Sequence, residues 1–459
     1  MKNTLLVPTL RELINSGNLS DIHEFCESCH PAEVAELISP LSPEEVWEVL
    51  NTVDLPLRAE IFSHLEGEFQ VDVISTLKRK DAVPLFTEMP PDDRADLFKR
   101  MPEEKRERLM PALAQAERED IRRLASYEEG TAGAVMTSDY AFLTPDLTAS
   151  EAVERLRQVA PDKETIYYAY VVNEKRKLMG FVSLKDLILA QKNARIADIM
   201  NEDVIFARVY DDQEDAARKI QKYDLIALPV INGGDALVGI ITHDDAIDII
   251  TQEHTEDMEK FMAIAGSHES AGYLRISAWS HFKNRSVWVV ALAGLGLVSG
   301  FIVQNYQSLL LQFAILAAFM PMLAASGGNT GSQSATLVIR ALALKEISFR
   351  DIFRILAKET QVALMLGMLL GFLAYGRVVI FGGGDMLPQG ASLSMIGFAV
   401  AAALSLQVIS ATLIGALLPM IVARFKLDPA LVASPALSSV VDITGLLIFF
   451  SMARLILAL

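Results

Sequence analysis

The stretch SVWVVALAGLGLVSGFIVQNYQSLLLQFAILAAFMPMLAASGGNTGSQSATLVI (286–339) contains no Asp, Glu, Lys, Arg or His. A helix that spans a bilayer needs about 20 predominantly apolar residues, so this stretch has room for two spans. A second stretch without ionisable groups covers 386–423. The apolar pattern predicts a membrane domain over 282–459 with five helical spans, near 286–304, 312–339, 359–381, 393–422 and 434–458.

Charge is divided unevenly along the chain. The 459 residues include 41 basic and 58 acidic side chains, which gives a formal net charge of −17. Residues 282–459 have a net charge of +5, so residues 1–281 have a net charge of −22. An acidic region of this size repels phosphate and attracts cations, which argues against nucleic acid as a partner.

Basic residues near the ends of the predicted spans indicate the orientation, because they concentrate in cytoplasmic loops. Nine of them fall on the side of the acidic region, and only Arg377 and Arg454 fall on the other side. We therefore expect an integral protein of the cytoplasmic membrane, in contact with lipid, with its N-terminus in the cytoplasm and its C-terminus outside.

The first part of the chain has a 12-residue repeat. An apolar residue recurs at Leu41, Val53, Leu65, Leu77, Met89, Met101 and Leu113. Several repeats open with proline and acidic residues, as in PPDDRADLF (90–98), and this composition favours the first turn of a helix. We expect an α-helical solenoid over 1–129, with an irregular helical bundle as the alternative.

Residues 130–251 contain a duplication with an offset near 64. The segment VMTSDYAFLTPDLTASEAVERL (135–156) is similar to IMNEDVIFARVYDDQEDAARKI (199–220). Each copy alternates β-rich runs with an amphipathic helix, and the pair resembles tandem α/β CBS domains, a module that usually regulates its host protein.

The CBS resemblance implies a site for ATP or another adenine nucleotide. In that family a Ser/Thr-x-x-Asp pattern can hold the ribose, and 183–186 and 242–245 both match it. The same short pattern is also a helix-start signal, so the structural alternative stays open. The implied residues are Tyr168, Ser183, Lys185, Asp186, Thr242 and Asp245.

Residues 244–265, which begin with DDAIDIITQEHTEDMEK (244–260), read as an acidic helix, and we expect a connecting helix over 252–281 that leads towards the first span. Carboxylate oxygens at this density suit Mg²⁺ or Ca²⁺. The alternative is a solvated acidic face.

PMLAASGGNTGSQSAT (321–336) ends the second predicted span. Its proline and glycines, Pro321, Gly327, Gly328 and Gly331, are expected to break or loosen the helix. Irregular backbone at membrane depth is tolerated where it lines a cavity or is buried in protein, and Asn329 and Gln333 would offer amide groups there. The alternative is close helix packing through small residues.

Asp442, in SSVVDITGLL (438–447), is the only acid well inside a predicted span. An intramembrane carboxylate is a functional-site hypothesis by default, and its alternative is an interhelical hydrogen bond. Residues 282–459 contain no His and no Cys, which disfavours a dedicated path for zinc or copper.

Taken together, these segments resemble the MgtE family of magnesium channels over nearly the whole chain. The most specific segments are SGGNTGSQSATLVIRAL (326–342), LDPALVASPALSSVVDITGLLIFF (427–450) and 244–260. The resemblance implies a homodimer in which Asp442, with Asn329 and Gln333 beside it, holds a hydrated ion on the dimer axis. It also implies that acids of the cytosolic part bind Mg²⁺ and shut the pore. The matching acids are Asp92, Asp96, Asp212, Glu214, Asp224, Asp245, Asp248, Glu253, Glu256 and Asp257.

One further motif, Cys26-Glu27-Ser28-Cys29-His30, matches the haem-attachment pattern C-x-x-C-H. Haem attachment needs an exported domain, and with His23 the motif could instead supply four zinc ligands. The favoured interpretation is two small apolar residues on a short helix.

We therefore expect a Mg²⁺ channel or transporter that imports magnesium and is closed by cytosolic Mg²⁺. The alternatives are a CBS-regulated transporter of another divalent cation, such as Mn²⁺ or Co²⁺, and a membrane-anchored Mg²⁺ sensor. No nucleophile–base pair is apparent, so we do not expect an enzyme.

Overall fold

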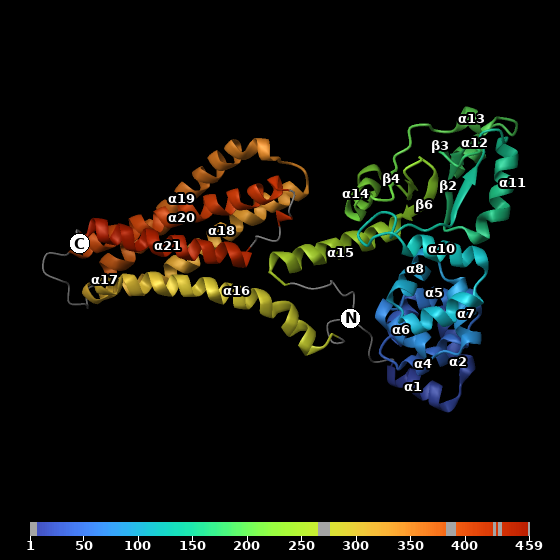
Figure 1. Ribbon diagram of the computed structural model, residues 1–459, viewed down its shortest axis with the longest axis horizontal. Coiled ribbons are helices and arrows are strands. Elements are labelled where there is room, and N and C mark those ends of the chain that lie inside the picture. Colours follow the sequence, from blue (N-terminus) through green and yellow to red (C-terminus); the bar gives the residue numbers. More distant parts are fainter. Residues whose placement is uncertain (1–6, 265–275, 382–391, 426–427, 430–433, 458–459) are drawn as a thin grey trace. The chain divides into compact units, whose positions relative to one another are not determined.

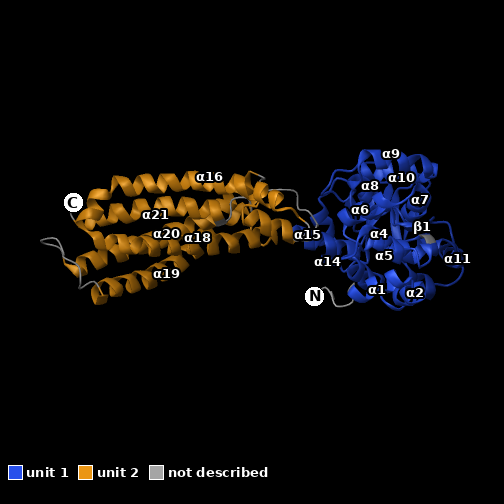
Figure 2. Ribbon diagram, turned by 90° about the horizontal axis from the view of Figure 1, so that it is seen from below, with its two compact units in different colours: residues 1–253, 269–273 blue, residues 254–268, 274–459 orange. Residues whose placement is uncertain are grey.

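The computed structural model describes residues 7–264, 276–381, 392–425, 428–429 and 434–457. The chain divides into two compact units, which are coloured separately in Figure 2. The first contains residues 1–253 and 269–273, and the second contains residues 254–268 and 274–459. Each unit is described by itself.

The first unit opens with ten α-helices, coloured blue to cyan in Figure 1. Helices two apart in sequence pack on each other, as α3 does on α5 and α4 on α6. The helices are α1 (Val7–Ser16), α2 (Leu19–Ser28), α3 (Pro31–Ile38), α4 (Pro43–Leu50), α5 (Leu55–Ser63), α6 (Gly67–Thr76), α7 (Arg79–Glu88), α8 (Pro91–Arg100), α9 (Glu103–Leu109) and α10 (Gln115–Ala125), with a 3-10 turn η1 (Met110–Ala112) before α10.

The 12-residue period corresponds to one short helix and its turn. Each recurring apolar residue follows the end of a helix, and Val53 and Met89, for example, are 3% and 1% exposed. Ser42 and Glu45 form a capping box at the start of α4, and Pro43 occupies the first turn. The proline and acidic residues at the helix starts therefore predicted the helices, and the 12-residue spacing of apolar residues predicted the core.

The duplicated segment forms two three-stranded sheets with the same topology. In each sheet the first strand is parallel to the second, and the second is antiparallel to the third. Tyr140 and Tyr170 donate hydrogen bonds from their hydroxyls to the carbonyls of Leu237 and Ala227 in the other copy, which ties the copies together. The strands are β1 (Tyr140–Leu143), β2 (Thr165–Val172), β3 (Leu178–Ser183), β4 (Ala207–Arg208), β5 (Ala227–Ile231) and β6 (Leu237–Thr242).

Five helices accompany the two sheets. The offset of 64 holds for the helices that start at Ala149 and Gln213. The helices are α11 (Ala149–Val159), α12 (Leu184–Leu189), α13 (Ile196–Ile199), α14 (Gln213–Tyr223) and α15 (His243–Phe261), with a 3-10 turn η2 (Ala160–Asp162) after α11. The acidic helix predicted near 244–265 is α15. Residues 265–275 of the expected connecting helix lie outside the described residues, and the next helix starts at Ala278.

The second unit is a bundle of long apolar helices (Figure 1). Helix α20 packs on α18, α19 and α21, and α16 packs on α21. The elements are α16 (Ala278–Asn305), α17 (Gln307–Gln312), η3 (Ala314–Phe319), α18 (Met320–Ala343), η4 (Phe349–Asp351), α19 (Ile352–Phe381), α20 (Leu393–Arg424) and α21 (Ser434–Ile456).

Within the described residues, four helical segments are long and apolar enough to cross a membrane. They are 278–305, 349–381, 393–424 and 435–456. The predicted second span, 312–339, corresponds to the end of α17, the turn η3 and most of α18, and it does not qualify. Helix α18 has 24 residues but carries the polar residues of 326–336, so its composition is less apolar than that of the other long helices.

The expected break at the glycines of 321–336 is wrong. Helix α18 continues from Met320 to Ala343, with Pro321 in its first turn, where proline is tolerated. The glycines instead allow close helix packing, which was the alternative interpretation. A Cβ on Gly415 of α20 would lie 2.2 Å from the carbonyl oxygen of Gly331. The irregular backbone lies before α18, at Tyr306 and through η3.

Candidate functional site

Asp442 lies half-buried in the middle of α21, as the sequence predicted. The preceding residue, Val441, is fully buried and packs against α18, where a Cβ on Gly327 would lie 2.9 Å from its Cγ1. No hydrogen bond or ion pair to the Asp442 carboxylate occurs among the described residues. The interhelical hydrogen bond considered as the alternative is therefore not formed there.

Gln407 of α20 is a buried polar residue that the sequence analysis missed. It is fully buried, and its Nε2 donates a hydrogen bond of 3.0 Å to the carbonyl oxygen of Val441. Its Oε1 is buried with no hydrogen-bond partner among the described residues. Gln407 thus holds the backbone of α21 one residue before Asp442. Its only signal in the sequence is a single amide in a long apolar helix.

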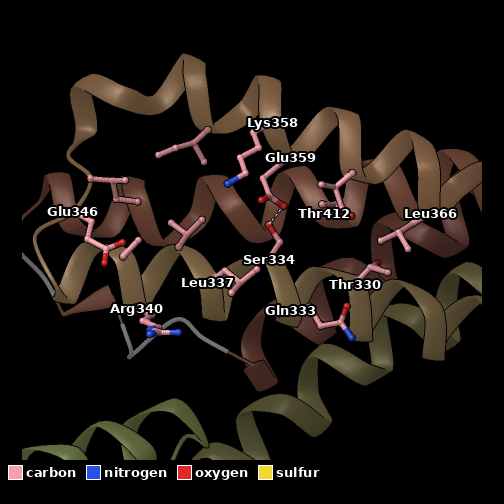
Figure 3. Close-up of a pocket in the computed structure, with 15 residues that line it drawn as sticks. Thr330, Gln333, Ser334, Leu337, Arg340, Glu346, Lys358, Glu359, Leu366 and Thr412 are labelled. Carbon is pink, nitrogen blue, oxygen red and sulfur yellow. Dashed lines mark hydrogen bonds between the residues drawn. The ribbon is translucent and has the colours of Figure 1, made fainter.

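The predicted amides Asn329 and Gln333 lie four residues apart on α18, and both are exposed in the single chain. Gln333 lines a cavity of about 480 Å³ between α18 and α19, with Thr330 and Ser334 beside it (Figure 3). Two of the three predicted pore residues, Asn329 and Gln333, therefore share one helix, and Asp442 lies on a helix that packs against it.

Glu359 of α19 is a second carboxylate that the sequence analysis missed, because it lies at the first position of a predicted span. The Ser334 hydroxyl of α18 donates a hydrogen bond of 2.8 Å to Glu359 Oε2, drawn as a dashed line in Figure 3. This bond joins α18 to α19 inside the cavity that Gln333 lines.

In the first unit, carboxylates of α8 lie close to the start of α15. Burial raises the pKa of Asp92 well above its usual range, and the charges of Asp245, Asp93 and Glu164 act in the same direction. Burial also raises the pKa of Asp93 to about 6, and the charge of Asp245 acts in the same direction. The Oδ1 atom of Asp92 is buried without a hydrogen-bond partner among the described residues.

The start of α15 completes this acidic cluster, which we define as Asp92, Asp93 and Asp245. Burial raises the pKa of Asp245, and the charges of Asp244 and Asp248 add to the effect, although a hydrogen bond of 2.5 Å from the Thr242 hydroxyl opposes it. The sequence predicted Asp92 and Asp245 through family resemblance. It missed Asp93, because nothing in the sequence says that α8 meets α15.

The remaining predicted sensor acids do not join that cluster. Asp96, on α8 as well, has a pKa raised by burial and lies 3.9 Å from the Lys99 ammonium. Asp212 caps α14 by accepting a hydrogen bond from the Glu214 backbone N–H, and Glu214 pairs with Arg218. Asp224 follows α14 in the left-handed region, at a φ of 52°.

The other predicted acids of α15 form hydrogen bonds or ion pairs, or are exposed. Glu253 accepts a hydrogen bond of 2.6 Å from the Gln213 side chain. Glu256 lies 2.5 Å from the Lys260 ammonium, which also contacts the Asp428 carboxylate at 3.1 Å. Asp248 and Asp257 are exposed.

Among the described residues, no group of three or more His, Cys, Asp or Glu side chains is close enough to hold a metal ion. The four candidate zinc ligands therefore do not converge. His23 Nδ1 lies 2.9 Å from the Thr52 carbonyl oxygen, and Cys26 is fully buried, which raises the pKa of its thiol to about 11. The acidic cluster has too few converging carboxylates to enclose a bare ion, but Mg²⁺ usually keeps several waters and needs only one or two protein carboxylates.

The predicted nucleotide residues have local structural roles. Ser183 caps α12, where its hydroxyl accepts from the Asp186 N–H at 3.1 Å and contacts Asp186 Oδ2 at 2.5 Å. Thr242 and Asp245 make the same contact in the second copy. Tyr168 packs edge-on against Phe181, and Lys185 is exposed.

The comparisons define the class. The profile of a family of divalent cation transporters matches residues 320–452, that of the MgtE intracellular N domain matches 29–130, and that of the CBS domain matches 132–193 and 196–252. These matches place the chain in the class of divalent cation transporters that carry an intracellular N domain and paired CBS domains.

Similar curated proteins support the family assignment. The magnesium transporter MgtE of Thermus thermophilus is 42% identical over 339 residues, covering 74% of this chain and 72% of the relative. That of Bacillus subtilis is 35% identical over 333 residues, covering 72% and 71%. The chain belongs to the MgtE family, and it is a membrane protein.

Two solved structures resemble the first unit. The cytosolic domain of the Mg²⁺ channel MgtE in complex with ATP matches with a TM-score of 0.51 and 37% identity, covering 53% of this chain and 100% of that structure. The soluble part of a magnesium transporter matches with a TM-score of 0.50 and 32% identity, covering 54% and 97%.

Proposed function

We propose that this protein carries Mg²⁺ across the cytoplasmic membrane through a path lined by α18 and α21. The observation that supports this proposal is Asp442, a half-buried carboxylate in an apolar helix with no hydrogen-bond or ion-pair partner among the described residues. A membrane protein keeps such a costly group where it serves an ion or proton path. The names of the relatives, which are magnesium transporters, support Mg²⁺ as the ion.

A homodimer would complete the site. One carboxylate neutralises only half of a divalent charge, and a two-fold axis through the path brings a second Asp442 to the same ion. Mg²⁺ gives up its water reluctantly, so a wide site of two carboxylates and amides from Asn329 and Gln333 suits the hydrated ion. We propose that α18 also crosses the membrane, which brings the number of spans to five. Five spans and the basic loops then put the N-terminus in the cytoplasm and the C-terminus outside.

We further propose that cytosolic Mg²⁺ closes the path. Ionised Asp92, Asp93 and Asp245 repel one another, and burial makes their charge still more costly. A hydrated Mg²⁺ between α8 and α15 removes that repulsion, so it binds the compact state better than the open state and shifts the population towards it. The other predicted acids of α8, α14 and α15 would add weaker sites: Asp96, Asp212, Glu214, Asp224, Asp248, Glu253, Glu256 and Asp257.

A nucleotide is the second proposed ligand. A similar cytosolic domain has been solved in complex with ATP, and this chain has both Ser/Thr-x-x-Asp pairs. A ribose would have to replace the contacts between Ser183 and Asp186 or between Thr242 and Asp245. Because Asp245 also belongs to the acidic cluster, nucleotide and Mg²⁺ binding would be coupled through that residue.

Uptake into liposomes tests the proposal directly. Purified protein is reconstituted into vesicles that contain a Mg²⁺-sensitive dye, and initial rates are compared for Mg²⁺, Mn²⁺, Co²⁺ and Na⁺. We expect uptake of Mg²⁺ that depends on the protein. Faster uptake of Mn²⁺ or Co²⁺ than of Mg²⁺ would favour the transporter of another divalent cation, and no uptake of any ion would favour the membrane-anchored sensor.

A further inference from the structure

The first unit contains a cavity where the end of α6 and the start of α7 meet α9, three helices that are labelled in Figure 2. Its volume of about 520 Å³ is within the range of pockets that bind small organic ligands. No residue of the acidic cluster lines it. The apolar part of its lining includes Ile74, Leu77, Ala82, Met101 and Leu109.

Positive charge is in excess in this cavity. The lining carries one carboxylate, Glu107, and four bases: Lys78, Arg79, Lys105 and Arg108. Arg108 also forms an ion pair of 2.7 Å with Glu104, which lies outside the lining. Four positive and two negative charges leave a net charge of +2. The excess is a local reversal, because residues 1–281 as a whole have a net charge of −22.

Two of the four bases, Lys78 and Arg79, have no counter-ion. No ion pair or hydrogen bond of either side chain occurs among the described residues. Lys105 differs, because its ammonium donates a hydrogen bond of 2.7 Å to the carbonyl oxygen of Ser75. Asp81, in the first turn of α7, does not line the cavity. Cations at the start of a helix are unfavourable, so an anion that neutralises this pair would stabilise the region.

The charge and the walls of the cavity together narrow the class of ligand. A metal cation is disfavoured by the positive excess. A nucleotide is disfavoured because the described lining has no aromatic ring on which a base could stack. A phosphate monoester carries a charge between about −1.5 and −2 at pH 7, which matches the excess. An aliphatic body on that phosphate would cover the apolar walls.

We propose that this cavity binds a small organic phosphate monoester with an aliphatic body. Lys78 and Arg79 supply the unpaired charge, and an arginine guanidinium has the planar geometry that matches phosphate oxygens. Because the bases of the lining come from both sides of the cavity, the bound anion connects the start of α7 with α9. The site shares no residue with the proposed ion path, the acidic cluster or the Ser/Thr-x-x-Asp pairs.

Calorimetric titration of the full-length protein, purified in detergent and kept in chelator, tests this inference. The probes are butyl phosphate, inorganic phosphate and glutarate. We expect butyl phosphate to bind about tenfold more tightly than inorganic phosphate, because part of the butyl chain is buried. Glutarate, whose two charges lie apart, should bind no better than inorganic phosphate. Equal affinity for the two phosphates would overturn the aliphatic body, and glutarate binding as tight as that of butyl phosphate would overturn the phosphate.

Charge variants locate the binding. Lys78→Gln with Arg79→Gln should weaken butyl phosphate binding by about tenfold or more. The matched control, Lys80→Gln with Arg122→Gln, removes one exposed lysine and one exposed arginine outside the lining and should bind like the wild type. Glu107→Gln should strengthen binding about threefold, because it removes a repulsive charge. Unchanged affinity in the cavity variant, or an equal loss in the control, would overturn the inference.

A footprint on the wild-type protein keeps the test independent of whether the variants fold. Lysine acetylation is followed by mass spectrometry with and without butyl phosphate. Lys78 should be protected by the probe, and Lys80 beside it should not. Equal acetylation of Lys78 in both samples would overturn the inference, because a phosphate bound only at the CBS domains leaves this residue open. Neither measurement involves ion transport or Mg²⁺, so their outcome is independent of the proposed function.

Discussion

The acidic cluster of the first unit and Asp442 of the second unit are both carboxylate sites, but their surroundings differ. In the cluster, Asp92, Asp93 and Asp245 act on one another, and burial raises the pKa of each. Asp442 has no charged neighbour among its interactions in the described residues, and its helix packs against small residues and the Gln407 amide. The difference teaches that crowded carboxylates can respond to a cation by changing the fold around them. A solitary carboxylate on a braced helix is suited to hold the ion without such a change.

The largest expected effect is at Asp442. Asp442→Ala should reduce Mg²⁺ uptake by liposomes to the level of empty vesicles, because the path then has no negative charge. Asp442→Asn keeps the shape but not the charge, and it should be impaired as well. Both variants should elute as monodisperse protein of wild-type size. Uptake at the wild-type rate by either monodisperse variant would remove Asp442 from the ion path.

The next largest effect is expected when the charges of the acidic cluster are removed. The triple variant Asp92→Asn, Asp93→Asn and Asp245→Asn should resist proteolysis of its cytosolic part without Mg²⁺, because the repulsion is gone. It should also lose the Mg²⁺ dependence of uptake, with any remaining response shifted to at least about tenfold higher Mg²⁺. The matched control is Asp72→Asn, an exposed acid of α6 outside the cluster, which should behave like the wild type. An unchanged Mg²⁺ response in the triple variant would mean that the cluster is not the gate.

Gln407→Leu tests whether the bracing of α21 matters. The variant is close to isosteric, removes the hydrogen bond to the Val441 carbonyl and should lower uptake about fivefold, equivalent to about 1 kcal/mol. The half-maximal Mg²⁺ concentration for closure should stay the same, because Gln407 lies in the second unit. Thr412→Val, at a buried polar residue of the same helix whose hydroxyl bonds to its own helix, serves as the control. A fivefold loss in that control too would indicate general disturbance of α20.

The smallest expected effect is that of pH on compaction without Mg²⁺. Asp93 has a pKa of about 6 in the compact state against an ordinary value of 3.8, so the compact state binds more protons than the open state. Compaction is therefore most favourable at low pH and weakens as pH rises from about 4 to 6, and the raised pKa of Asp92 acts in the same direction. In chelator, protease protection should be stronger at pH 5.5 than at pH 8. The triple variant should show a smaller difference, because Glu164 remains and burial raises its pKa as well, and stronger protection at pH 8 would contradict the sign.

The sequence predicted what is encoded locally. The 12-residue spacing gave the helices and the core of the first part, because each repeat is one helix and one turn. The position of Asp442 in an apolar run made it a candidate for the ion site without any tertiary information. Family resemblance, rather than spacing, pointed to Asp92 and Asp245.

What the sequence missed depends on tertiary contacts. Glycine and proline weaken an isolated helix, but contacts such as that between Gly331 and Gly415 keep α18 continuous. Asp93, Gln407 and Glu359 each matter through a partner on another helix, and single-chain patterns do not reveal such partners. Asp212 also has a role that the resemblance did not indicate, because this acid serves as the cap of a helix.

The central claim is that one ion both passes Asp442 and closes the path through the acidic cluster. The most direct test is a titration of Mg²⁺ on the cytosolic side of reconstituted wild-type protein, with uptake and protease protection measured on the same vesicles. We predict that uptake falls and protection rises with the same half-maximal Mg²⁺ concentration. Protection that saturates while uptake continues unchanged, or uptake that closes with no change in protection, would contradict the account.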